Sequence, residues 1–171
     1  MDTDQPHPFI KELQRLVDDS KTHNNRGNRA ALRRYWSPTT RHQAYPILGR
    51  LHAIDDNRKT ILAALYAELP NHRSGVSIGK AAFSLGKPSD GHHPYDQHFR
   101  RLLACDTLDD LAAQLHRLVK RLTRKGIGLD YSELHKNLNY WANYSEKVKI
   151  RWAADFWQAP IEQIQPEATE A

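Results

Sequence analysis

The stretch "TLDDLAAQLHRLVKRLTRKG", residues 107–126, decides the fold, because it contains every feature of one complete amphipathic helix. Its leucines recur at spacings of three and four residues and form one apolar stripe, at Leu108, Leu111, Leu115, Leu118 and Leu122. Thr107 can cap the N-terminus, two aspartates occupy the first turn, and Gly126 stands just behind the last turn. The stretch therefore predicts a long helix with a defined start, end and buried face.

The same helical period recurs on both sides of this stretch, whereas the alternation that marks a strand is nearly absent. Helices are predicted within residues 6–17, 29–36, 58–69, 77–86, 130–141 and 145–157. By the usual lengths of helices and loops, the chain should form an all-α protein of roughly seven to nine helices without a sheet.

The segment "KPSDGHHPY", residues 87–95, is the clearest interruption, because it is dense in proline, glycine, serine and aspartate. We expect two packed helical bundles to meet near it, an N-terminal bundle at residues 1–88 and a C-terminal bundle at residues 89–160. Residues 161–171 carry three glutamates and no cation, and we expect them to form a disordered acidic tail.

The charge composition indicates which class of partner the protein binds. The chain has 171 residues, a formal net charge of +5 and a pI near 9.4, and the acidic tail leaves the remainder more basic still. This balance favours a polyanionic partner.

Cys105 is the only cysteine, which argues against a disulfide framework and indicates a reducing compartment. No apolar run approaches the roughly 20 residues of a membrane span, and the polar start does not resemble a signal peptide. We therefore expect a cytoplasmic protein without membrane contact.

Catalytic and metal chemistry find little support in the sequence. The run "HHPYDQH" offers His92, His93, Asp96 and His98, but it overlaps the most loop-like segment and matches no ligand spacing. Solvated loop histidines are the preferred interpretation, and a metal-dependent hydrolase built on this run is the weakest alternative. Cys105 is better suited to a small buried residue than to a nucleophile. Without a phosphate loop or a positioned acid–base pair, we expect no enzyme, no cofactor, no metal and no small-molecule substrate.

The four tryptophans can serve either the core or a surface that binds bases. Trp141 and Trp152 lie on apolar stripes, so we expect both in the core. For Trp36 and Trp157 the pattern leaves core packing and stacking on bases open.

The stretch "NNRGNRAALRRYW", residues 24–36, contains four arginines and no carboxylate, namely Arg26, Arg29, Arg33 and Arg34. We expect Arg26 and Arg29 at a helix start, where each cation opposes the helix dipole at a cost of roughly a few tenths of a kcal/mol. A bound phosphate would offset the positive charge at this helix start, because helix N-termini bind anions and arginine forms paired hydrogen bonds with phosphate. The cations late in residues 107–126, Arg124 among them, instead complement the dipole and are typical of a solvated helix end.

Seven segments also follow one another in a familiar order. They are "RGNRAALRRYWSP", "YPILGRL", "NRKTILAALYA", "SIGKAAFSLG", "HFRRLLACDTLDDLAAQLHRLV", "LDYSELHKNLNYW" and "RWAADFW". Together they resemble the CasB family, the small subunit of the type I-E CRISPR interference complex Cascade. The resemblance covers about residues 9–158 and rests on the ordered series, since no single motif is diagnostic.

This resemblance implies an all-helical subunit without catalytic activity, built as two bundles and present as two head-to-tail copies. The implied partners are the CRISPR RNA, the target and displaced DNA strands, the backbone subunits and the large subunit of Cascade. Arg33 and Arg34 match an arginine pair of the family, and Arg58 matches a basic position at the start of the next helix. Lys147 and Lys149 fall in a basic turn of the family. Arg100 and Arg101 fall in a region that is generally basic.

We therefore expect a protein that binds nucleic-acid backbone. Its expected site residues are Arg26, Arg29, Arg33, Arg34, Arg58, Arg100, Arg101, Arg124, Lys147 and Lys149. Such contacts would stabilise guide RNA–target DNA pairing and hold the displaced strand of an R-loop. The alternative is a helical adaptor for an acidic protein surface, which the modest net charge and the many helix faces also allow.

Overall fold

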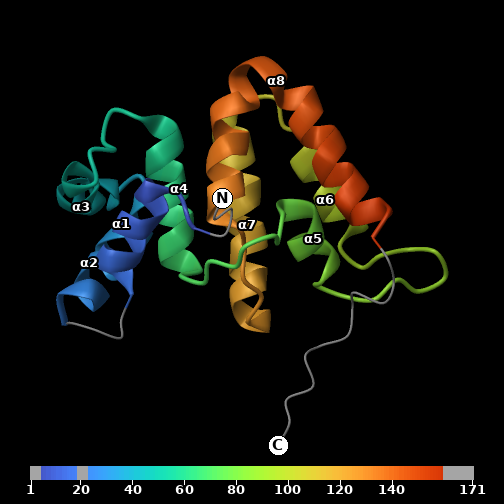
Figure 1. Cartoon of the computed structure of the whole chain (residues 1–171), viewed down its shortest axis with the longest axis horizontal. Helices are drawn as coiled ribbons and strands as arrows, with labels where there is room; N and C mark the ends of the chain where they lie inside the picture. Colours follow the sequence, from blue (N-terminus) through green and yellow to red (C-terminus); the bar gives the residue numbers. More distant parts are fainter. Residues whose placement is uncertain (1–4, 19–22, 160–171) are drawn as a thin grey trace, which may run out of the picture.

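A computed structural model describes residues 5–18 and 23–159, which form eight α-helices and two 3-10 helices (Figure 1). The elements are α1 (Pro8–Val17), α2 (His23–Arg33), η1 (Arg34–Trp36), η2 (Arg41–Ala44), α3 (Tyr45–Arg50), α4 (Asn57–Glu68), α5 (Ile78–Phe83), α6 (Asp96–Leu103), α7 (Leu108–Lys125) and α8 (Tyr131–Trp157). Within those two ranges there is no strand, and only two isolated bridges occur. The predicted all-α class and the expected number of helices are confirmed.

The central helix is α4, which is buried on every side. Each residue from Thr60 to Leu69 is buried, far beyond the single apolar stripe of a surface helix. The carboxylate of Asp56 caps its start by accepting hydrogen bonds from the N–H groups of Arg58 and Lys59. α2 packs against α4, and so do α7 and α8 (Figure 1). α4 therefore joins the first helices of the chain to the last ones.

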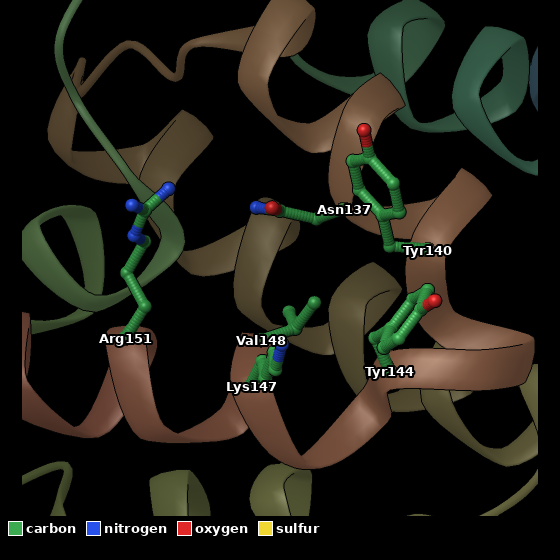
Figure 2. Close-up of a pocket in the computed structure, with 6 residues that line it drawn as sticks. All are labelled: Asn137, Tyr140, Tyr144, Lys147, Val148 and Arg151. Atoms are coloured by element: carbon green, nitrogen blue, oxygen red, sulfur yellow. The ribbon is translucent and has the colours of Figure 1, made fainter.

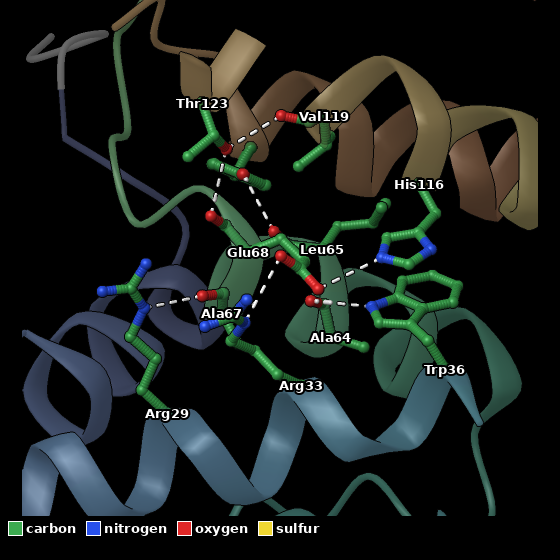
Figure 3. Close-up of polar contacts among 11 residues, drawn as sticks. Arg29, Arg33, Trp36, Ala64, Leu65, Ala67, Glu68, His116, Val119 and Thr123 are labelled. Atoms are coloured by element: carbon green, nitrogen blue, oxygen red, sulfur yellow. Dashed lines mark hydrogen bonds and ion pairs between the residues drawn. The ribbon is translucent and has the colours of Figure 1, made fainter. Parts of the chain in front are cut away.

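The C-terminal end of α4 is buried as well, and its last carbonyl groups have no partner within the helix. Side chains from three other helices supply the missing donors, and Figure 3 shows those of Arg29 and Thr123. Arg29 Nε donates to the Ala67 carbonyl at 2.8 Å, Thr123 Oγ1 to that of Glu68 at 3.1 Å and Tyr131 Oη to that of Leu69 at 2.6 Å. The end of α4 thus fixes the positions of α2, α7 and α8 relative to one another.

The long helix predicted at residues 107–126 is present as α7, with the predicted ends. Thr107 Oγ1 accepts a hydrogen bond from the N–H of Asp110 at 3.1 Å. Gly126 ends the helix in the left-handed conformation with φ of 67°, which glycine adopts without strain. The apolar stripe faces the core, with Leu108 half-buried and the other four leucines buried.

The last two predicted helices, residues 130–141 and 145–157, are both present and meet at Tyr144, so that together they form the kinked element α8. The φ of −136° and ψ of 33° at Tyr144 are non-helical and turn the chain. The kink brings the rings of Trp141 and Trp152 into a stack at 5.8 Å. Both indoles are buried, which confirms their prediction as core residues. We call residues 131–143 the first limb of α8 and residues 145–157 the second limb.

α5 packs closely against the second limb of α8. Gly79 makes this approach possible, because a Cβ there would lie 2.3 Å from the main-chain oxygen of Trp152. α5 precedes the expected bundle boundary near residue 88 yet packs against α7 and α8. The division into residues 1–88 and 89–160 stays a prediction, and the acidic tail expected at 161–171 lies outside the described residues.

We expect Gly79→Ala to lower the free energy of unfolding by about 1–3 kcal/mol, because the new methyl group meets main chain that no rotamer change can move. Gly27→Ala is the matched control, since Gly27 lies in α2 with nothing within 4 Å of its Cβ position. This control should gain about 0.5–1 kcal/mol through helix propensity. Urea denaturation of both variants tests the contact, and equal effects of the two substitutions would contradict it.

The N-terminal helix docks on the first limb of α8 through a pair of imidazole rings. The N–H of His7 donates to Ser132 Oγ at 2.9 Å, and its ring lies 4.3 Å from that of His135. His135 is 7% exposed, and its Nε2 has no hydrogen-bond partner among the described residues. Burial, followed by the charges of His7 and Lys59, lowers the pKa of His135 to about 4.

Because the folded chain resists protonating His135, acid should destabilise the fold. Between pH 6.5 and about 4 the unfolded chain binds a proton that the folded chain does not, so stability falls as the pH falls through this window. We expect a loss on the order of 2 kcal/mol between pH 7 and pH 4.5 from this group. His135→Gln should remove that part of the pH dependence in urea denaturation, whereas His42→Gln, at an exposed position, should keep the wild-type profile.

Candidate nucleic-acid interface

One of the arginines of α2, Arg29, does not lie where the sequence predicted it. The helix begins at His23, so Arg26 lies in its first turn but Arg29 lies in its second. The prediction of Arg29 at a helix start is therefore wrong. The helix includes the asparagines because the side chains of Asn25 and Asn28 donate to main-chain carbonyls at the end of α1, at 2.7–3.0 Å. Because these asparagine side chains bond to α1, they do not form the local side-chain hydrogen bonds to the backbone of α2 that would disfavour the helix.

Arg33 is held in a half-buried ionic cluster around Glu68 (Figure 3). Its Nε lies 3.3 Å from Glu68 Oε2, and His116 Nε2 lies 3.2 Å from Glu68 Oε1. Burial alone would raise the pKa of Glu68, but the hydrogen bond from His116 and the charge of Arg33 lower it. The ring of His116 stacks on Trp36 at 4.0 Å, so this tryptophan serves the junction of α4 and α7.

Three other arginines that the sequence singled out in the first half, Arg26, Arg34 and Arg58, are exposed. Arg26 is exposed, and Arg34 bonds to the Gln43 side chain. Arg58 lies at the start of α4, as predicted, and its guanidinium donates to the Asn139 carbonyl at 3.3 Å. A phosphate could replace these solvent-exposed contacts at low cost.

The densest group of cations lies where α6 meets the C-terminal half of α7. We call it the α6–α7 basic face, consisting of Arg101, Arg117, Arg121, Arg124 and Lys125, all of them exposed. In the part of the chain that the structure describes, no carboxylate forms an ion pair with any of them. Three of these residues, Arg121, Arg124 and Lys125, line a hollow of about 250 Å³ together with Tyr95.

His98 lies within this face and accepts a hydrogen bond from Arg121. The Nη2 of Arg121 lies 3.2 Å from His98 Nε2. Burial and then the charges of Arg121, Arg101 and Arg117 lower the pKa of His98. The helix dipole accounts for cations in the last turn of α7, as the sequence interpretation held, but Arg117 lies two turns earlier. The sequence signal that could have revealed the face is the run of five cations without an acid in residues 117–125.

Arg100 and Trp157 are engaged with each other at the end of α8. Arg100 pairs with Asp96 one helical turn away, and its guanidinium lies 5.2 Å from the centroid of the Trp157 ring. Trp157 is 42% exposed and donates to Asp96 Oδ1 at 2.9 Å. Arg100 thus has a different environment from Arg101 of the basic face, although the sequence grouped them together.

The interpretation of the histidine run as solvated is wrong for His93. Its ring is buried between Phe83 and Phe156, with Nε2 2.8 Å from the Phe83 carbonyl. Its Nδ1 accepts from the N–H of Tyr95 at 3.0 Å. The loop folds back onto the core because this imidazole satisfies a carbonyl at the end of α5. Within residues 5–18 and 23–159, no three potential ligands are grouped to hold a metal ion.

A groove of about 450 Å³ lies on the inner side of the α8 kink (Figure 2). Both limbs line it, with Asn137, Tyr140, Tyr144, Lys147, Val148 and Arg151. Of these, the sequence singled out only Lys147. Tyr140 and Tyr144 stand one helical turn apart and are 56% and 50% exposed, and this spacing beside basic residues was the signal available.

Lys149 lies on the other side of the second limb, and its side chain is 13% exposed. Its ammonium group lies 3.4 Å from Asp106 and 5.5 Å from the centroid of the Trp141 ring. This cation therefore covers the stacked tryptophans, whereas Lys147, two residues earlier, faces the groove.

The comparisons with known proteins agree with one another. The family model of CRISPR-associated protein Cse2 matches residues 28–157. A Cse2-family protein from Thermus thermophilus is 25% identical with a TM-score of 0.70, over 88% of this chain and 96% of that one. CasB from Thermobifida fusca has the same fold at 21% identity, with a TM-score of 0.70 over 87% of this chain and 95% of that one. No curated protein matches the sequence. None of the described helices has the length and apolarity of a membrane span.

The ionic cluster predicts different effects for two adjacent arginines. Arg33→Ala should lower the free energy of unfolding by about 1 kcal/mol, because it leaves the buried Glu68 with one cation fewer. Arg34→Ala removes only an exposed contact and should stay within about 0.5 kcal/mol of wild type. Thermal denaturation at neutral pH compares them, and a larger loss for Arg34→Ala would contradict the assignment.

Proposed function

Because the chain belongs to the family of CRISPR-associated protein Cse2, we propose that it is a non-catalytic subunit of a type I-E Cascade complex and binds nucleic-acid backbone. Its proposed partners are the CRISPR RNA, the target and displaced DNA strands, the backbone and large subunits, and a second copy of itself. We place this complex in the cytoplasm. The role of the subunit is to stabilise guide RNA–target DNA pairing and the displaced strand.

The observation that carries this proposal is the α6–α7 basic face. Five exposed cations without carboxylate partners among the described residues, one of them two turns from the helix end, repel one another in the free chain. A phosphate backbone relieves the repulsion and releases its own counterions, so binding should be independent of sequence and sensitive to salt. Lys147 in the groove and the exposed Arg26, Arg34 and Arg58 extend the proposed contacts.

The energetics of strand exchange explain why such contacts matter. Replacing a DNA duplex by an RNA–DNA duplex is nearly balanced in free energy, so a few contacts to phosphates shift it. Contacts that hold the displaced strand also oppose the reverse reaction. Burial raises the pKa of the Cys105 thiol, so this residue is poorly suited to act as a nucleophile.

Replacing Arg117, Arg121 and Arg124 by glutamine should weaken DNA binding and R-loop formation by the assembled complex. The slope of log affinity against log salt should become shallower by about 2, since roughly 0.7–0.9 is lost for each phosphate contact. A control variant with glutamine at Lys11, Arg15 and Arg50 removes equal charge from other exposed positions and should retain most of the affinity. Titrations over several salt concentrations measure both.

Equal losses in the two triple variants would show that only net charge matters and would contradict the assigned face. If the wild-type chain binds neither single-stranded nor double-stranded DNA at low salt, the proposal is wrong. The helical adaptor for an acidic protein surface would then be the better explanation of the basic face.

A further inference from the structure

We propose that the groove inside the α8 kink binds an unpaired base, which stacks on Tyr140 or Tyr144. This inference rests on the proposed nucleic-acid binding and names the form of nucleic acid that the groove takes. The groove has a volume of about 450 Å³, and its walls come from both limbs of one helix (Figure 2).

The two tyrosines are exposed aromatic surface without a structural task in the described chain. Their rings meet edge to face at 6.1 Å, and neither hydroxyl forms a hydrogen bond within residues 5–18 and 23–159. They contrast with the buried Tyr66 and Tyr131, whose hydroxyls are bonded to Asp18 and Leu69. Exposed rings next to cations are the arrangement on which proteins stack successive bases.

Cations lie close to the rings on both limbs. The ammonium group of Lys147 lies 5.3 Å from the centroid of the Tyr144 ring, and Arg151 lies one turn further along the second limb. Lys136 is exposed one turn before Tyr140. Arg151 also acts electrostatically on Glu133, a half-buried carboxyl group of the first limb whose pKa is raised by burial and then by Asp130 and Asp155. Lys147 and Arg151 are the charged side chains that line the groove itself, and both attract phosphate.

The geometry selects an unpaired base over a paired one. Bases inside a duplex have both faces covered by their neighbours, so they offer a tyrosine ring nothing to stack on. Val148 adds apolar surface to the lining, and the amide of Asn137 can form a hydrogen bond with the edge of a stacked base. A displaced DNA strand and an unpaired stretch of RNA share this chemistry.

The test compares single-stranded and double-stranded nucleic acid on the same variants. The double variant Tyr140→Leu, Tyr144→Leu should bind oligothymidylate and oligouridylate about 5- to 100-fold more weakly than wild type, since stacking on one or two rings is lost. Its affinity for a duplex of matched length, and its salt slope, should not change, because stacking releases no counterions. Loss for oligothymidylate alone would assign the groove to DNA, and loss for oligouridylate alone to RNA.

Two controls separate stacking from other roles. The double variant Tyr140→Phe, Tyr144→Phe should keep wild-type affinity, because stacking needs the ring and not the hydroxyl. Tyr45→Leu removes a tyrosine that is 43% exposed in α3, away from the groove, and should have no effect. In wild type, photocrosslinking of 5-iodouridine-containing oligonucleotides should attach to Tyr140 or Tyr144.

Unchanged single-strand affinity in the leucine variant, or an equal loss for duplex, would overturn this inference. The proposed backbone binding would still stand in either case if the variant with glutamine at Arg117, Arg121 and Arg124 loses affinity. Absence of any nucleic-acid binding by the wild-type chain would overturn both.

Discussion

The buried C-terminal end of α4 is the constraint on which the rest of the structure depends. Its last carbonyls cannot reach water, so each needs a donor from elsewhere in the chain. Arg29, Thr123 and Tyr131 supply these donors from α2, α7 and α8. These hydrogen bonds fix α2, α7 and α8 around the end of α4. The Glu68 carboxylate adds to them by pairing with Arg33 of α2 and His116 of α7.

This constraint explains why the arginines of α2 were difficult to interpret from sequence. Arg29 and Arg33 look like a charge run that lacks a partner, because the groups they satisfy lie more than thirty residues away in α4. The cations of α7 were misjudged in the other direction: their sequence is typical of an ordinary helix end, although they have no carboxylate partner among the described residues. Their lack of carboxylate partners in the described chain, and the approach of Arg101 from α6, become visible only in three dimensions. The proposed binding surface therefore lies further toward the C-terminus than the sequence emphasised.

Local signals predicted the helices well, and tertiary contacts account for the errors. Thr107, Gly126 and Asp130 act within one turn of their own position, so their capping roles were predictable. His93 and Tyr144 depend on distant partners. The loop around His93 is polar in sequence, yet its imidazole is needed by a carbonyl of α5. The kink at Tyr144 is stabilised by stacking between tryptophans eleven residues apart, which no local rule anticipates.

The contact between Gly79 and the main chain of Trp152 lets α5 lie directly against the second limb of α8, because glycine places no Cβ between the two backbones. The first limb is attached to α4 through the hydrogen bond from the Tyr131 hydroxyl to the Leu69 carbonyl. Tyr144 joins the limbs, and its non-helical dihedral angles set the angle between them. Because both limbs line the groove, a ligand bound there would contact the chain on either side of that angle.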